Sequence, residues 1–159
     1  MKILFLDIDG VLNSRAYDRR RNWDEQTNID ETRLPLLREI VDRTGAAIVL
    51  ISTWRAHLDD GMSARDAAGE YVVHTFAKYG LRIFGKTPDL GPGADRKDEV
   101  AAWLAERGGG VEKFAILDDR VFGWAELSPF YVHTDPHFGL GLEEEQVKRA
   151  VGLLNGEEG

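Results

Sequence analysis

Five short runs of apolar residues along the chain predict β-strands. They cover residues 2–6, 46–51, 81–84, 114–117 and 130–134. Three of the runs are almost continuously apolar, which is typical of strands buried on both faces of a parallel sheet. The pattern therefore favours a sheet covered by other elements on its two sides.

The intervals between these runs contain apolar residues at helical spacing. Helices are expected over residues 31–43, 64–79, 96–107 and 143–154. In the first of them Leu34, Leu37 and Val41 share a face, Asp30 is a possible N-cap and Gly45 ends the helix. Residues 13–29 and 85–95 show neither period and are expected to be irregular. Alternating strands and helices predict one doubly wound, Rossmann-like α/β domain over residues 1–159, with a mainly parallel sheet of about five strands.

Composition and charge exclude several classes of protein and of metal site. The chain has 159 residues, enough for one sizeable core, and its 30% of charged residues is ordinary for a globular protein. No apolar run reaches the length of a membrane span, and the N-terminal pattern is unlike a secretory signal, so we expect a cytoplasmic protein with no membrane partner. A formal charge of −8 argues against an extended nucleic-acid surface but allows a local basic pocket. With no cysteine, any metal needs oxygen or imidazole ligands.

Polar residues gather where three of the predicted strands end. They are Asp7 and Asp9 after the first run, Ser52, Thr53 and Arg55 after the second, and Asp118 and Asp119 after the fourth. The carboxyl ends of parallel strands lie at one edge of a sheet, where ligands of open α/β folds bind. Because residues two apart in an extended chain point to the same face, Asp7 and Asp9 would repel each other, and we expect a positive group between them.

Two cations open the helix expected at residue 96. Arg96 and Lys97 stand where a helix N-terminus already favours an anion. Carboxylates, hydroxyls and a cation at one edge are suited to binding Mg²⁺ together with a phosphate group. The positive charges of the metal and of the cation would offset the repulsion between an anionic nucleophile and a phosphate dianion.

The motifs and their order resemble those of the haloacid dehalogenase-like (HAD) superfamily of phosphohydrolases, over nearly the whole chain. "DIDGV" is followed by a Ser or Thr after the second strand, a Lys or Arg before a later helix, and "LDD" after the fourth strand. More narrowly, the stretches "FLDIDGVLN", "IVLISTWR", "RKDEVAAWL", "ILDDR" and "HTDPHFGL" resemble the HAD domain of Swiss Army Knife RNA-repair proteins.

The resemblance implies a role for each acidic residue. Asp7 would be the nucleophile that forms an aspartyl-phosphate, and Asp9 would act as general acid and then as general base. Asp7, Asp118, Asp119 and the main-chain carbonyl of Asp9 would hold Mg²⁺.

Two role assignments stay open between neighbouring residues. Ser52, which directly follows the apolar run, is preferred to Thr53 as the hydroxyl that binds the phosphoryl group. Arg96 and Lys97 both fit the cationic motif: the narrower family favours Arg at the first position, whereas the superfamily usually has Lys. The further candidates for substrate binding are Gly10, Thr53 and Arg55.

Two other stretches of the chain carry patterns that allow a functional interpretation. "GLRIFGKT", residues 80–87, satisfies the P-loop consensus, but a strand occupies its variable positions and no helix can follow "PDLGPG", so we reject that interpretation. "RAYDRRRNW", residues 15–23, could clamp a substrate through arginine and aromatic side chains or could be a solvated loop.

The sequence therefore predicts a Mg²⁺-dependent phosphatase with little or no cap over its site. Such a site suits a large phosphate monoester, and by resemblance a nucleic-acid terminal phosphate. The alternatives are a phosphatase of nucleotide or sugar phosphates, and a catalytically silent HAD-like binding module. The oligomeric state is left open.

Overall fold

The computed structural model describes residues 1–121 and 123–157. A five-stranded sheet, with every neighbouring pair parallel, forms its centre in the order β3-β2-β1-β4-β5. The strands are β1 (Lys2–Leu6), β2 (Ala47–Leu50), β3 (Ile83–Lys86), β4 (Lys113–Asp118) and β5 (Tyr131–His133). The predicted doubly wound α/β architecture is confirmed. The third strand lies two residues later than expected, so Gly85 and Lys86 belong to it and not to the following loop.

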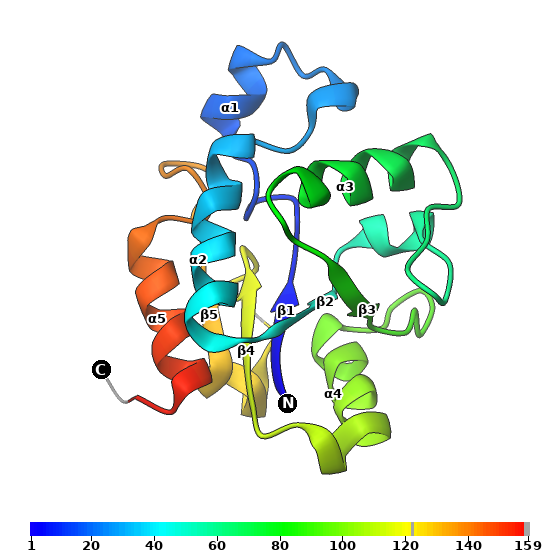
Figure 1. The fold of residues 1–159 in the computed structure, drawn as a ribbon, viewed down its shortest axis with the longest axis vertical. Helices are drawn as coiled ribbons and strands as arrows, with labels where there is room; N and C mark the ends of the chain where they lie inside the picture. Colours follow the sequence, from blue (N-terminus) through cyan, green and yellow to red (C-terminus); the bar gives the residue numbers. More distant parts are fainter. Residues whose placement is uncertain (122, 158–159) are drawn as a thin grey trace.

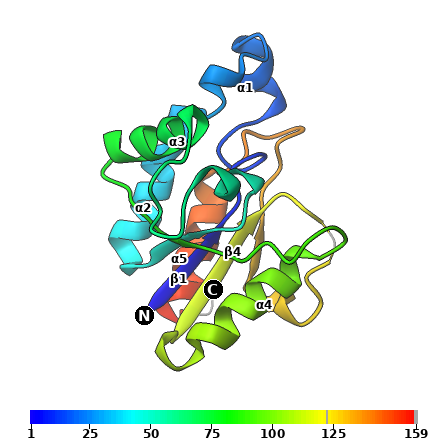
Figure 2. The ribbon, with the colours of Figure 1, turned by 90° about the vertical axis from the view of Figure 1, so that its right-hand side faces the viewer.

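Helices cover both faces of the sheet (Figures 1 and 2). They are α2 (Leu34–Thr44), α3 (Ala67–Lys78), α4 (Arg96–Arg107) and α5 (Glu144–Asn155). Asp30 caps a 3-10 turn at Glu31–Arg33, so α2 begins later than predicted, and α3 begins after Asp66 rather than at residue 64. None of the helices in the described ranges combines the length and the hydrophobicity of a transmembrane segment.

A further helix, α1 (Arg15–Arg20), forms within a segment that the sequence analysis expected to be irregular. The Ser14 hydroxyl starts it by accepting a hydrogen bond from the Tyr17 N–H at 3.2 Å. The helix has no buried residue, which explains why no apolar period announced it. In Figure 1 it lies beyond the carboxyl ends of the strands.

Side chains of β1 alternate between two hydrophobic clusters. Leu4 and Leu6 pack in the cluster that includes residues of α2, α3 and α5, while Ile3 and Phe5 pack in the cluster that includes residues of α4. All four side chains are fully buried. This two-sided burial is the physical reason for the continuously apolar run, because neither face of the strand contacts water.

The segment with the P-loop consensus folds as a strand. Residues 83–86 form β3, and Lys86 at its end donates to the main-chain oxygen of Leu58 at 2.7 Å. The rejection of a nucleotide P-loop is confirmed, because a P-loop needs these residues free to wrap a phosphate.

The strand order reverses between β1 and β4. From β1 the chain proceeds outward through β2 and β3, and then crosses to β4 and β5 on the other side. The loops that leave the two central strands diverge at such a point and open a crevice at the carboxyl edge of the sheet. Asp7 and Asp118 lie at this crevice.

Candidate active site

Three carboxylates converge where β1 and β4 end. Asp7 follows β1, Asp118 is the last residue of β4, and Asp119 comes next. One carboxylate oxygen of each residue lies within 4.8 Å of the others. Asp7 and Asp118 are 2% and 0% exposed, so water screens their repulsion poorly. The Asp7 N–H donates to the Leu117 oxygen at 2.9 Å, which extends the pairing of the two strands to the cluster itself.

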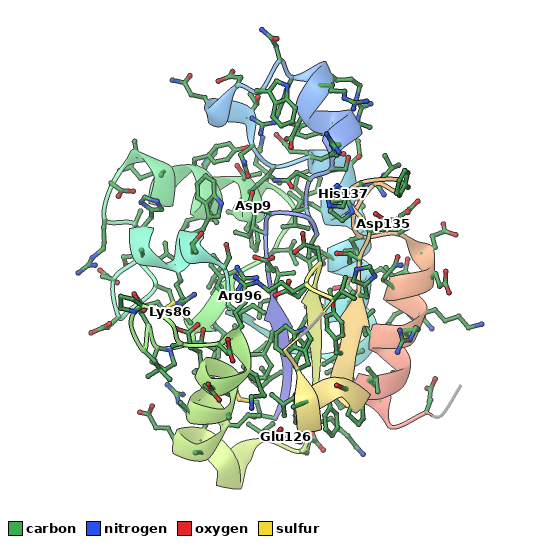
Figure 3. The ribbon with its side chains drawn as sticks, turned by 180° about the vertical axis from the view of Figure 1, so that it is seen from behind. Asp9, Lys86, Arg96, Glu126, Asp135 and His137 are labelled. Atoms are coloured by element: carbon green, nitrogen blue, oxygen red, sulfur yellow. The ribbon has the colours of Figure 1, made fainter. Side chains whose placement is uncertain are left out.

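Arg96, the first residue of α4, supplies positive charge to this cluster (Figure 3). Its Nη1 lies 2.9 Å from Asp7 Oδ2 and 2.6 Å from Asp118 Oδ2. One guanidinium does not balance three carboxylates. Burial, reinforced by Asp118, raises the pKa of Asp7 to about 7 although Arg96 opposes the rise. Burial and Asp118 also raise the pKa of Asp119.

The donor set fits a hard divalent cation. The cluster offers only carboxylate oxygens, which Mg²⁺ prefers, and its unbalanced negative charge would be relieved by a bound cation. Asp7, Asp118 and Asp119 are three of the four predicted ligands. The fourth, the main-chain carbonyl of Asp9, stays a prediction.

The side chain of Asp9 lies outside the cluster. Its Oδ1 accepts from Asn13 Nδ2 at 2.9 Å and its Oδ2 from Trp54 Nε1 at 3.2 Å. Asp7, by contrast, contacts Arg96, and the expected positive group between the two carboxylates stays a prediction. The strand ends at Leu6, and the chain turns so that the Leu12 N–H donates to the Ile8 oxygen at 2.8 Å, which sends the two carboxylates to different partners.

Gly10 allows this turn and the approach of Asp119. Its φ is +86°, and a Cβ at this position would lie 2.3 Å from Asp119 Oδ2. The Gly10 N–H donates to Asn13 Oδ1 at 2.8 Å, and its oxygen accepts from Thr134 Oγ1 at 2.8 Å. The glycine is therefore held from both sides beside the carboxylates.

The residues after β2 occupy three different environments. Ser52 is buried, and its hydroxyl accepts from the Trp54 N–H at 3.2 Å. Thr53 is exposed and lines a cavity beside the cluster. Arg55 is buried, with its Nη2 2.8 Å from Glu99 Oε2 and its Nη1 donating to the main-chain oxygens of Ile51 and Ser52.

Arg96 and Lys97 point in different directions. The Lys97 Nζ lies 3.7 Å from Asp98 and 3.9 Å from Glu126, whereas Arg96 contacts the carboxylate cluster. Figure 3 shows Glu126 well away from Arg96, toward the opposite end of the sheet. The spacing to the buried Val100 does not distinguish the two residues, because positions three and four apart both share a helix face.

Sequence reasoning missed four residues of this region. They are Asn13, Trp54, Glu99 and Thr134. Trp54 is only partly buried, and its indole N–H reaches Asp9. Its place two residues after Ser52 was the available signal, while Glu99 and Thr134 are far along the chain from their partners and carried none.

In the arginine-rich segment 15–23, some side chains already bond to residues of this segment or of the next few residues. Arg21 Nε pairs with Asp18 at 2.7 Å, and the Tyr17 hydroxyl donates to main-chain oxygens of Thr27 and Ile29. Trp23 is 57% exposed. A role of this segment as a substrate clamp stays a prediction.

Comparison with known proteins adds one finding. The model of a family described as "HAD domain in Swiss Army Knife RNA repair proteins" matches residues 3–147. No curated protein and no solved structure matches the chain.

Proposed function

Because the chain belongs to the family of HAD domains in Swiss Army Knife RNA repair proteins, we propose that it is a Mg²⁺-dependent phosphatase acting on terminal phosphates of nucleic acids. The reaction is the hydrolysis of a phosphoric monoester through an aspartyl-phosphate. The observation that carries the proposal is the group of Asp7, Asp118 and Asp119, the first two of them buried, with Arg96 at the point where the strand order reverses. A cytoplasmic location is part of the proposal.

Asp7 is the proposed nucleophile. Its carboxylate oxygen bonds to the phosphorus while the bond from phosphorus to the leaving oxygen breaks, and Asp9 gives that oxygen a proton. Asp9 then takes a proton from water, which attacks the aspartyl-phosphate, restores the Asp7 carboxylate and releases inorganic phosphate. The hydrogen bonds from Asn13 and Trp54 hold the Asp9 carboxylate for this exchange.

The remaining polar groups would bind the transferring phosphoryl group. Arg96, which already contacts the nucleophile, is the proposed cation. Ser52 is the proposed hydroxyl: its oxygen accepts from the Trp54 N–H, which leaves its own O–H to donate to a phosphoryl oxygen. Asp7, Asp118 and Asp119, with the main-chain carbonyl of Asp9, would hold Mg²⁺, which when bound neutralises charge between the nucleophile and the phosphate.

The short connections around the site support a large substrate. Between β1 and α2 the chain forms only α1 and short 3-10 turns, and between β2 and β3 one 3-10 turn and α3. A lightly covered site leaves room for a polymeric phosphate ester, in keeping with the RNA repair proteins of this family.

The test compares the wild-type protein with Asp7→Asn in Mg²⁺, on an aryl phosphate and on a 3′-phosphorylated oligonucleotide. Amide and carboxylate are nearly isosteric, so the variant should keep its circular dichroism spectrum and release no phosphate. Asp42→Asn, the same change at an exposed position of α2, should behave as wild type. Release from the aryl phosphate alone would replace the nucleic-acid substrate by a small phosphate ester. Release from neither would favour the silent module, and full activity of Asp7→Asn would refute the nucleophile.

A further inference from the structure

A cavity of about 540 Å³ opens beside the carboxylate cluster. Its walls are the 3-10 turn Thr53–His57, the segment that links β3 to α4, and the residue after Asp119. Arg96 lines this cavity and also contacts Asp7 and Asp118, so the cavity is continuous with the proposed catalytic centre. Its size lies in the range that takes a small ligand or one unit of a polymer.

Basic residues outnumber acidic ones in the lining of the cavity, although the whole chain carries a formal charge of −8. The basic residues are Arg55, Arg65, Lys86, Arg96 and Arg120. Arg55 is paired with Glu99, and Arg96 with Asp7 and Asp118. The remaining charged residues of the lining are three basic ones and two acidic ones: Arg65, Lys86, Arg120, Asp60 and Asp89. A positive cavity in an acidic protein attracts anions locally while the rest of the surface repels them.

The inner part of the cavity is held rigidly by buried contacts. Glu99 Oε2 accepts from Arg55 Nη2 at 2.8 Å and from the Leu90 N–H at 3.1 Å, which ties the turn after β2 to the segment before α4. The Lys86 Nζ donates to the main-chain oxygen of Leu58 at 2.7 Å, and Figure 3 shows it at about the height of Arg96 along the sheet. Side chains fixed in this way lose little entropy when a ligand binds.

The outer part of the cavity presents two uncommitted guanidinium groups. Arg65 and Arg120 are exposed, and neither has a carboxylate oxygen within 4.0 Å among the residues that the structure describes. Asp60 and Asp89 lie at the same cavity, and Asp89 is engaged by the Gly91 N–H at 2.9 Å. Arginine in this state is well suited to phosphate, which it binds with two parallel hydrogen bonds.

We propose that this cavity binds a second phosphate group of the substrate, one carried by the leaving group. The proposal rests on the proposed phosphatase function, which places the reacting phosphate at Asp7 and Arg96. The preferred substrates are then phosphate monoesters with another phosphate nearby. An oligonucleotide end, whose neighbouring phosphate is a diester, and a nucleoside bisphosphate share this chemistry.

The test measures binding and turnover separately. Arg65→Gln/Arg120→Gln removes two charges from the cavity, and the matched control Arg82→Gln/Lys148→Gln removes two exposed charges elsewhere. Each pair is combined with Asp7→Asn to prevent hydrolysis. Calorimetry then compares a nucleoside 3′-phosphate, a nucleoside 3′,5′-bisphosphate and a dinucleotide with a 3′-phosphate.

The ligands with two phosphates should bind with an affinity at least about tenfold higher than that of the nucleoside 3′-phosphate. This advantage should disappear in the cavity variant and persist in the control. In proteins with Asp7 intact, kcat/KM for an aryl phosphate should change less than about twofold in either pair. An advantage for the dinucleotide alone identifies a nucleic-acid end, and one for the bisphosphate alone a small metabolite.

Equal affinity for one and two phosphates would overturn the proposal, as would an advantage that survives in the cavity variant. An equal loss of affinity for all three ligands would also overturn it, because it would mean a general electrostatic effect. If the wild-type protein hydrolyses no phosphate monoester, the proposed function fails, while the binding comparison still decides whether the cavity holds a second phosphate.

Discussion

Removing one partner of the buried ion pair between Arg55 and Glu99 should cost much more unfolding free energy than replacing both partners by apolar residues. The two residues are 9% and 5% exposed, and their charged atoms lie 2.8 Å apart. Glu99→Leu leaves a buried guanidinium without its counter-charge, and such a change costs about 3–5 kcal/mol of unfolding free energy. Arg55→Met strands the carboxylate and should cost a similar amount.

The double variant Arg55→Met/Glu99→Leu removes both charges together. The two new side chains are apolar and of similar volume, and neither leaves a buried charge. We therefore expect the free energy of unfolding of the double variant to lie within about 1 kcal/mol of wild type. The two single losses should therefore be strongly non-additive.

Urea denaturation followed by circular dichroism measures the cycle. In a thermal melt of a chain of this size, a loss of about 3–5 kcal/mol lowers the melting temperature by roughly 6–20 °C. Glu39→Ala, which breaks the exposed pair with Arg43, is the control and should cost less than about 0.5 kcal/mol. A loss below about 1 kcal/mol in both single variants, or a double variant as unstable as the sum of the singles, would refute the assignment of a buried, energetically coupled pair.

Three further predictions concern the proposed catalytic centre. Excess chelator should abolish phosphate release and added Mg²⁺ should restore it; full activity in chelator would contradict a metal-dependent mechanism. Gly10→Ala should lower activity at least tenfold and destabilise the protein by about 1–3 kcal/mol, because the φ of +86° at this position is strained for alanine and the added Cβ would overlap Asp119. Turnover assays check the first effect and thermal melts the second. Arg96→Ala should reduce kcat by about a hundredfold or more, whereas Lys97→Ala, which loses contacts to Asp98 and Glu126, should change kcat less than about twofold.

Local patterns were sufficient for the sheet and for the residues at its edge. The run 2–6 predicted β1 because burial on both faces leaves no polar position in the strand. Asp7 and Asp118 were identified because each follows such a run, and parallel strands bring their carboxyl ends together whatever the detailed packing. The helix α1 was not predicted, because its stability depends on a cap and not on an apolar face.

The distinctions between neighbouring residues depended on tertiary packing. Successive residues of a helix point about 100° apart, so only one of Arg96 and Lys97 can face the carboxylates, and the seating of α4 through Val100 and Trp103 decides which. Asp9 separated from Asp7 because the chain turns after Leu6, which a two-residue spacing does not reveal.

The sequence by itself thus determined the strands, the order of the motifs and the chemical types at the edge of the sheet, because these follow from periodicity and from the direction of parallel strands. Only the tertiary structure decided the partners: Glu99 for Arg55, Trp54 for Asp9, and a cavity in which Arg65, Lys86 and Arg120 join Arg96. The physical reason is that hydrogen bonds and charges act over a few ångströms in space, between residues whose separation along the chain says nothing about that distance.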